Sequence, residues 1–309
     1  MPVVTRDGDA PACVAEIDVP RRFDFDETLR FQRMGGLDPT CQKARGSFWK
    51  AARTPAGAVT LHLARPTAAP LVVARAWGPG ARWTLDRVPG LLGLDDAPGD
   101  FVPGEPLVRL ARRYAGLHLS RTPWPLDALW GVILEQRVRF ADAARAYRRL
   151  VTLAGEPAPG PPGLLVGPSA DALLNLPTDA WRRAGVDGHR ALAMRHAARL
   201  ARLIEAAADL DLAQVRARLS RVRGCGPWTV EMTMGMHLGD PDAVPLGDCH
   251  MPHLVAWALA GETRGTDARM LELLDPYRGH RFRVIRLLFA ARIDAPRRGP
   301  GPAWTRAAS

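Results

Sequence analysis

A chain of 309 residues, 47% of them hydrophobic, is long enough to build two modest domains or one large one with real cores. The net charge of +10 favours a polyanionic partner, with nucleic acid first, although an acidic membrane surface or plain solubility would also suit it. The spacing of the four cysteines excludes a short-spaced zinc site or a regular iron–sulfur motif.

No apolar signal region opens the chain, and no stretch reaches the length of a membrane span. Unpaired, scattered thiols suit a reducing cytosol. We therefore expect a cytoplasmic protein, associated with the nucleoid when bound to DNA and acting as a monomer, with no cofactor, no metal and no membrane partner.

The first third of the chain has the pattern of strands. Val59, Leu61 and Leu63 alternate with polar residues, which is typical of a half-buried strand. Further strands are expected at Phe48-Trp49, at 71–77 and at 14–19, and helical patterns at about 25–33 and 83–94. The sequence predicts an α+β fold that begins with an N-terminal domain, 1–106, built on a small antiparallel sheet.

From residue 107 the pattern is helical, which predicts an all-helical domain over 107–292. An apolar stripe over 126–144 predicts one long amphipathic helix, followed by a Gly/Pro-rich connector at 155–168. Ser169 and Thr178 are expected N-caps, and Gly185 a helix stop. A helix is expected over 189–207, and shorter ones at about 211–221, 227–238, 250–260 and 280–291. A disordered basic tail is expected over 293–309.

The most informative segment is a hairpin between two helices. An apolar helix end runs through Arg223 into Gly224-Cys225-Gly226, and a new helix begins at Pro227. Two glycines one residue apart permit the positive φ angles of a tight reversal. The N–H groups at the start of the new helix would then point outward and could bind a phosphate. The alternative is an ordinary corner that binds nothing.

A carboxylate follows the hairpin. The segment Val244-Pro245-Leu246-Gly247-Asp248 delivers an aspartate to the start of another helix, 22 residues beyond Gly226. Taken alone, Asp248 is an ordinary N-cap.

Together these segments resemble the helix-hairpin-helix DNA glycosylase superfamily, and most closely the 3-methyladenine DNA glycosylase II family. Ile133-Leu134-Glu135-Gln136 is similar to that family's Ile-Leu-x-Gln helix. The resemblance covers about residues 108–290 and, more faintly, the N-terminal sheet. It implies a monofunctional DNA glycosylase of base excision repair that excises damaged bases, alkylated purines first, from double-stranded DNA by base flipping.

The resemblance also implies roles for single residues. Asp248 would be catalytic and would stabilise the positive charge that develops on the deoxyribose, a role that an N-cap geometry does not exclude. Relatives that also cut the strand use a lysine where this chain has Trp228. Neither Lys43 nor Lys50 lies near that position in the sequence, so lyase activity is not expected. Trp228 is either a core residue or, with Met232, part of the base pocket, where a ring favours a cationic base.

DNA contacts are expected from Gln136 and Arg137, from Arg223 and the hairpin, and from His250. Arg137 stands where the family has an intercalating wedge, but it is also a plausible surface arginine. His250 and His253 lack the further ligands of a metal site. Resemblance further implies that the hairpin carbonyls can hold a monovalent cation.

Three departures from the family weaken the substrate assignment. Arg223 replaces a proline, Met232 stands where an aromatic residue is frequent, and Arg286 lies near the place of a tryptophan. Two alternatives therefore stay open: a catalytically inactive DNA-binding protein, and a glycosylase for uracil, hypoxanthine or oxidised bases.

Overall fold

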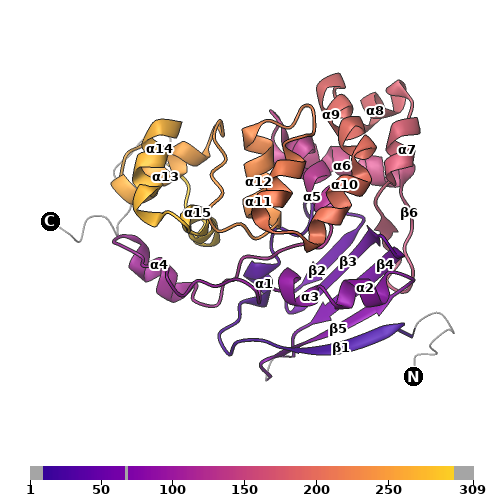
Figure 1. Cartoon of the computed structure of the whole chain (residues 1–309), viewed down its shortest axis with the longest axis horizontal. Helices are drawn as coiled ribbons and strands as arrows, with labels where there is room; N and C mark the ends of the chain where they lie inside the picture. The colour runs from indigo at the N-terminus through magenta and orange to yellow at the C-terminus, as the bar shows by residue number, and fades with distance from the viewer. Residues whose placement is uncertain (1–9, 67–68, 296–309) are drawn as a thin grey trace.

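The computed structural model describes residues 10–66 and 69–295. The chain opens with a five-stranded antiparallel sheet of order β1-β5-β4-β3-β2. Its strands are β1 (Cys13–Asp18), β2 (Cys41–Ala44), β3 (Ser47–Thr54), β4 (Gly57–Ala64) and β5 (Leu71–Trp77). Three short helices accompany it: α1 (Phe25–Thr28), α2 (Ala81–Leu85) and α3 (Val88–Leu91). The predicted antiparallel sheet is thus confirmed (Figure 1).

Alternation explains how the sheet is buried. Val59, Leu61 and Leu63 of β4 are fully buried and form one core with the short helices, while His62 on the other face is partly exposed. The opposite face of the sheet packs Ala51 and Trp49 against a second, two-stranded sheet made of β6 (Glu156–Pro157) and β7 (Leu165–Val166). Both faces of the main sheet are therefore covered.

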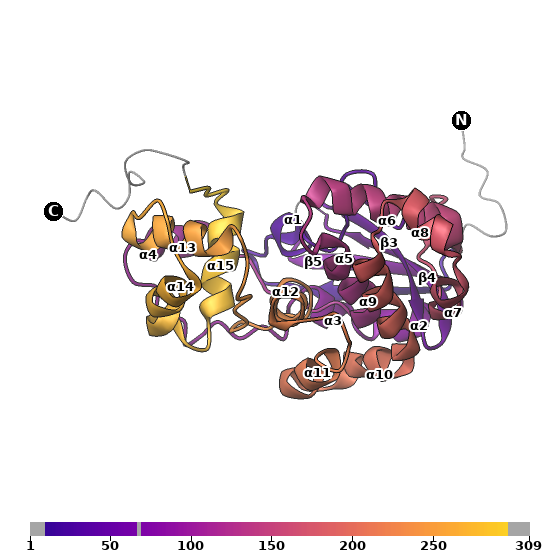
Figure 2. The ribbon, with the colours of Figure 1, turned by 90° about the horizontal axis from the view of Figure 1, so that it is seen from above.

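Apart from β6 and β7, the rest of the described chain is helical. The domain predicted as all-helical over 107–292 therefore also contains a two-stranded sheet, formed within the Gly/Pro-rich connector at 155–168. In order these helices are α4 (Leu107–Arg113), α5 (Pro125–Glu135), α6 (Phe140–Ala154), α7 (Ala170–Asn175), α8 (Thr178–Ala184), α9 (Gly188–Arg199), α10 (Ala201–Glu205), α11 (Leu212–Leu219), α12 (Pro227–His237), α13 (Met251–Ala260), α14 (Asp267–Leu274) and α15 (Arg281–Ala290). Single 3-10 turns follow α10 and α14. In two views at right angles, α12 lies between the group α13–α15 and the group α5–α10 (Figures 1 and 2).

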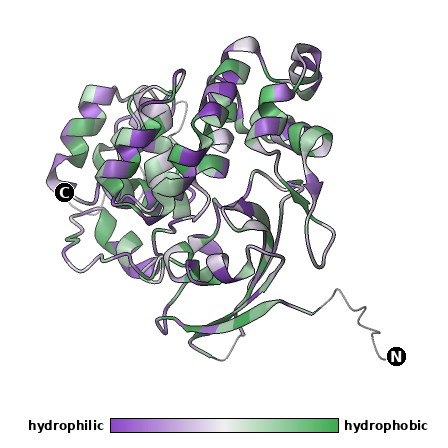
Figure 3. Ribbon diagram, turned by 45° about the vertical axis from the view of Figure 1, so that its right-hand side comes forward, coloured by the Kyte–Doolittle hydropathy of each residue, from purple (hydrophilic) through white to green (hydrophobic). Residues whose placement is uncertain are grey.

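Helix α5 is the centre of this helical part. Its residues from Pro125 to Leu134 are buried with the exception of Asp127, and it contacts α6, α9, α10 and α12. A helix that is apolar on almost all sides belongs inside a protein. Outer helices instead alternate hydrophilic and hydrophobic sides (Figure 3).

The predicted single helix over 126–144 is wrong, because the structure has two. Helix α5 ends at Glu135, Gln136 has ψ 118°, and Arg137 takes a left-handed φ of 57° before α6 begins at Phe140. The apolar stripe runs through both helices, and no glycine or proline marks the break. Periodicity alone could not reveal it.

Smaller expectations had mixed outcomes. Ser169 caps α7 by accepting from Ala172 N, and Gly185 ends α8 with φ 84°, as predicted. Thr178 was wrongly predicted as a cap: Pro177 precedes α8, and Thr178 is its first residue. The helix expected over 189–207 is divided at Leu200 into α9 and α10.

A buried ion pair links the two predicted domains. Asp96, from the loop after α3, forms an ion pair with Arg283 of α15, and both side chains are buried. The domain limits remain a prediction. Of the predicted tail, Ile293 is buried in the helical core, and residues 296–309 lie outside the described residues. None of the described helices is both long and apolar enough to span a membrane.

Candidate active site

The hairpin joins α11 to α12 through Gly224. Gly224 has φ 87°, and a Cβ there would lie 2.7 Å from Ala193 Cβ. Both the left-handed backbone and the lack of space for a side chain therefore require glycine at this position. Gly226 differs from the prediction: its φ of −77° is available to any residue, and a Cβ would meet nothing within 4 Å. A single left-handed glycine therefore makes the reversal.

Two side chains from other helices hold the hairpin in place. Gln136, just after α5, donates through Nε2 to Gly224 O and to Thr229 Oγ1, each at 2.8 Å. From α9, His196 Nδ1 accepts from Arg223 N at 2.9 Å. The Gln136 side chain, predicted as a DNA contact, thus links the end of α5 to the hairpin.

Several N–H groups of this region are left for an outside acceptor. Among the described residues, no acceptor pairs with the backbone N–H of Gly224, Gly226, Trp228 or Thr229. Gly224 and Gly226 are exposed, and Thr229 is buried. The exposed donors lie at the positive end of the 11-residue helix α12, where a negative charge is stabilised.

Asp248 lies at the start of α13 and accepts three hydrogen bonds. Trp228 Nε1 donates to Oδ2 at 2.8 Å, while His250 N and Met251 N donate to Oδ1 at 2.7 and 2.8 Å. The side chain is half-buried. Asp248 was wrongly predicted as the N-cap, because His250 holds that position and Asp248 lies two residues before it. Its three donors nevertheless complement a negative charge.

Trp228 agrees in part with the reading as a core residue and also makes a contact that the sequence did not predict. It packs partly against the helical core, but its indole N–H fixes the carboxylate of Asp248. The first of the two cavities described next is lined by Met232, one turn further along α12, and not by Trp228.

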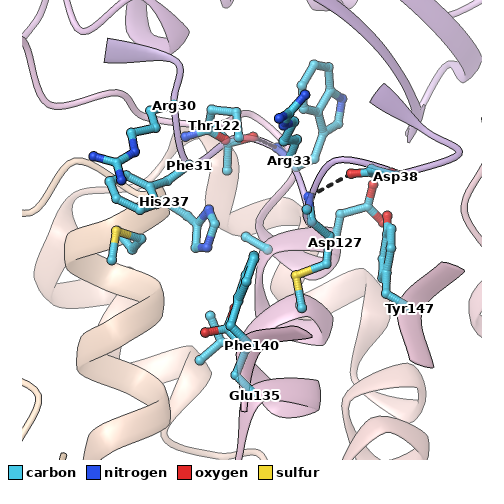
Figure 4. A pocket seen from close by; sticks show the side chains of 18 of the residues that line it. Arg30, Phe31, Arg33, Asp38, Thr122, Asp127, Glu135, Phe140, Tyr147 and His237 are labelled. Atoms are coloured by element: carbon cyan, nitrogen blue, oxygen red, sulfur yellow. Dashed lines mark hydrogen bonds between the residues drawn. The ribbon is translucent and has the colours of Figure 1, made fainter. Parts of the chain in front are cut away.

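That cavity, of about 470 Å³, lies between the segment after α1 and helices α5, α6 and α12 (Figure 4). Its volume exceeds that of one nucleobase, and its lining is mixed. Apolar and aromatic contacts come from Phe31, Met34, Val132, Phe140, Met232 and Met236. Phe140 is an exposed aromatic residue at the first position of α6, so an apolar ring is open to a ligand.

One wall of the cavity is a buried polar network. Lys50 Nζ donates to Thr40 Oγ1 at 2.8 Å, and Thr40 in turn lies within 2.8 Å of Asp38 and 3.3 Å of Tyr147. Burial opposes the charge of Lys50, but Tyr147, Asp38 and Asp127 outweigh it and raise the pKa of the ammonium. Lys50 therefore stays protonated. The sequence did not predict its place beside a cavity.

Two arginines enclose the Phe31 ring. The guanidinium carbons of Arg286 and Arg30 lie 4.6 and 4.9 Å from its centroid. Burial lowers the pKa of Arg286 to about 10 against the pull of Glu27, so it is still charged at neutral pH. Arg286 thus stands behind the ring at the cavity wall, in the region where the family resemblance expects a tryptophan.

A second cavity adjoins the first. It has a volume of about 1070 Å³ and is lined by Asp248, Cys249, His250 and His253, with Met232 shared between the two cavities. The His253 ring is engaged, since Nδ1 accepts from Gly265 N at 3.0 Å. Among residues 10–66 and 69–295, no cluster of three or more metal-binding side chains occurs.

The reasoning from sequence missed Glu135. It is the last residue of α5, lines the first cavity, and points into it beside Phe140 (Figure 4). Burial, and then the charge of Asp248, raises the pKa of Glu135 to about 7. Glu135 occupies the variable position of Ile-Leu-x-Gln, so the motif itself gave no reason to select it.

No family model and no curated protein sequence matches the chain. Its structure superposes on a 3-methyladenine DNA glycosylase from Archaeoglobus fulgidus with TM-score 0.76 and 18% identity, over 90% of this chain and 98% of that one. An 8-oxoguanine glycosylase/lyase from Clostridium acetobutylicum, solved with double-stranded DNA, gives 0.66 at 13% identity over 91% and 98%. A Schizosaccharomyces pombe 3-methyladenine DNA glycosylase, solved with abasic DNA, gives 0.50 at 16% identity over 62% and 93%. The chain therefore has the fold of the helix-hairpin-helix DNA glycosylases.

Proposed function

We propose that the protein is a monofunctional DNA N-glycosylase that removes damaged bases, alkylated purines first, from double-stranded DNA. The observation that carries this proposal is the position of Asp248, which is held by three N–H donors on the wall of the second cavity, and this cavity shares Met232 with the first. The similar structures are themselves glycosylases, and two of them were solved with DNA.

The hairpin is the proposed docking element. Unpaired N–H groups at Gly224 and Gly226 face solvent, and Arg223 beside them is exposed. Such a site binds a DNA phosphate without reading sequence. The net charge of +10 adds non-specific attraction to the duplex.

The chemistry assigned to Asp248 is electrostatic. As the base leaves, positive charge develops at C1′ of the deoxyribose, and a carboxylate on the opposite side stabilises it and orients the attacking water. Two unit charges about 4 Å apart at an effective dielectric near 20 interact by about 4 kcal/mol, an upper bound of roughly three decades in rate.

The exposed turn between α5 and α6 is the proposed wedge. Arg137 is exposed and holds φ 57°, and no hydrogen bond or ion pair restrains its side chain within the described part of the chain. Backbone strain at an exposed, unpaired side chain supports a functional role. Inserted into the stack, Arg137 would fill the space of the extruded base.

Replacement of Arg137 by alanine should lower the single-turnover excision rate about tenfold, because the energy of unstacking is no longer offset. Binding to undamaged duplex should change less. Arg139→Ala is the matched control, since Arg139 lies on the same turn and forms only an exposed ion pair with Asp142. Equal excision rates for wild type and Arg137→Ala would show that Arg137 is not the wedge.

Strand cleavage should be absent. Trp228 occupies the position of the lyase lysine, and Lys50, the cavity lysine, is protonated and bonded to Thr40. A Schiff base needs a neutral amine. Borohydride added during turnover should therefore trap no covalent DNA complex, whereas a trapped adduct would show that a lyase step exists.

The proposal is tested by incubating the protein with duplexes carrying 3-methyladenine, 7-methylguanine, hypoxanthine or uracil, and measuring free base by chromatography. Release of an alkylated purine at the highest rate is expected. Binding to every duplex with no release would instead identify a catalytically inactive DNA-binding protein.

A further inference from the structure

Glu135 has an unusual environment for a carboxyl group. It is the last residue of α5 and lines the first cavity together with Met232 and Phe140. Throughout residues 10–66 and 69–295, no side chain or backbone N–H donates a hydrogen bond to it, and no cation pairs with it. Glu135 is thus a half-buried carboxyl on a cavity wall with no partner among the described residues, and it is open to a ligand in the cavity.

Charged and titratable groups face the cavity from several elements. Arg30, Arg33 and Asp38 come from the segment after α1, and His237 comes from α12. Burial, with a contribution from Lys50, lowers the pKa of His237 to about 4, so it is neutral near pH 7.

Three further groups face the cavity from its polar wall: Lys50 of β3, Asp127 of α5 and Tyr147 of α6. Burial raises the pKa of Asp127 and of Tyr147, against the charge of Lys50. Asp248, at the start of α13, is the charged neighbour that acts on Glu135, and it opposes ionisation. Near neutral pH Glu135 therefore exchanges between the acid and the carboxylate.

We propose that Glu135 is a general acid that protonates the departing base, and so extends the substrates of this site to neutral purine lesions such as hypoxanthine. This inference rests on the proposed glycosylase function. A cationic alkylated purine leaves without protonation, whereas a neutral purine departs readily only when a ring nitrogen gains a proton. Two carboxyl groups divide the work: Asp248, which accepts three hydrogen bonds, and Glu135, which has no partner among the described residues.

The step balances as follows. The bond between C1′ and N9 breaks, and its electron pair leaves with the base. The proton of the Glu135 carboxyl moves to a purine ring nitrogen, so the base departs as a neutral molecule. Water then adds to C1′ beside Asp248 and loses a proton to solvent, and Glu135 regains one from solvent.

Glu135→Gln separates this role from the others. On duplex hypoxanthine at pH 6.5 we expect a single-turnover rate about 100-fold below wild type, within the ~10²–10⁴ that general acids contribute. On 7-methylguanine, which is already cationic, the rate should stay within about twofold. The wild-type rate on hypoxanthine should fall as pH rises through about 7, the pKa of Glu135, and this dependence should vanish in the variant.

Glu205→Gln is the matched control, because burial also raises the pKa of Glu205, but Glu205 does not line the first cavity. It should leave both rates unchanged. The free energy of unfolding, measured as a function of pH, shows whether the variant is folded. Between pH 4.5 and 7 the native protein binds more protons at Glu135 than the unfolded chain does, so wild type loses stability as pH rises. Glu135→Gln lacks this loss, so its stability relative to wild type should increase over the same range.

Three outcomes would overturn the proposal: equal loss on both lesions, no loss on hypoxanthine, or a wild type that releases 7-methylguanine but never hypoxanthine. A pH dependence that survives in Glu135→Gln would assign the proton to another group, with Asp127 the next candidate. If wild type releases neither base, the proposed glycosylase function fails first, and this inference fails with it.

Discussion

Asp248→Asn is expected to lower the rate of base release about 10³-fold while leaving DNA affinity within a fewfold of wild type. The change removes the negative charge that faces C1′, and about 4 kcal/mol is the upper bound for that interaction. Single-turnover release of 7-methylguanine, with enzyme in excess over duplex, measures the chemical step directly.

The substitution keeps two of the three hydrogen bonds and loses the one from Trp228 Nε1, because an amide NH2 group cannot accept it. An asparagine oxygen can still accept from His250 N and Met251 N, as asparagine does at helix N-caps. Asp211→Asn is the control, because Asp211 caps α11 by accepting from Gln214 N but lies on no cavity wall. It should keep full activity. A tenfold or smaller loss in Asp248→Asn would show that the carboxylate charge is not the main source of catalysis.

Gly224→Ala is expected to destabilise the protein by about 2–5 kcal/mol. Part comes from the left-handed backbone, φ 87°, which costs an alanine about 1–2 kcal/mol. The remainder comes from a Cβ placed 2.7 Å from Ala193 Cβ, where overpacking costs about 1–3 kcal/mol. Chemical denaturation measures the loss.

DNA affinity should fall as well, since relief of the contact with Ala193 moves the hairpin away from the Gln136 side chain that holds it. Gly226→Ala supplies the contrast: its φ of −77° suits alanine and its Cβ would meet no atom within 4 Å. Stability of that variant should match wild type within about 0.5 kcal/mol. Comparable destabilisation at both glycines would contradict the geometry described for the reversal.

Local chemistry allowed much of the fold to be predicted from sequence. Alternation at Val59, Leu61 and Leu63 located β4, and the apolar run at 71–77 coincides with β5. Gly224 and Pro227 marked the hairpin because backbone freedom and a helix start depend on residue type alone. The break at Arg137 escaped prediction because arginine does not favour a left-handed φ and no glycine or proline marks the position.

The candidate site was predictable only in part. Asp248 could be found because it stands at a fixed distance from a recognisable hairpin. The cavity could not, since Phe31, Lys50 and Glu135 come from segments far apart in the chain and meet only in the folded protein. Trp228 shows a similar limit: its packing was foreseen, but the hydrogen bond from its indole to Asp248 depends on the approach of α12 and α13.

The most direct test of the central claim uses one duplex carrying 7-methylguanine, incubated with wild type or with Asp248→Asn and then divided, one half being treated with alkali. We predict strand breaks only for wild type and only after alkali, which would show Asp248-dependent formation of abasic sites without lyase activity. Equal breakage by both proteins, or none by either although both bind the duplex, would contradict the account.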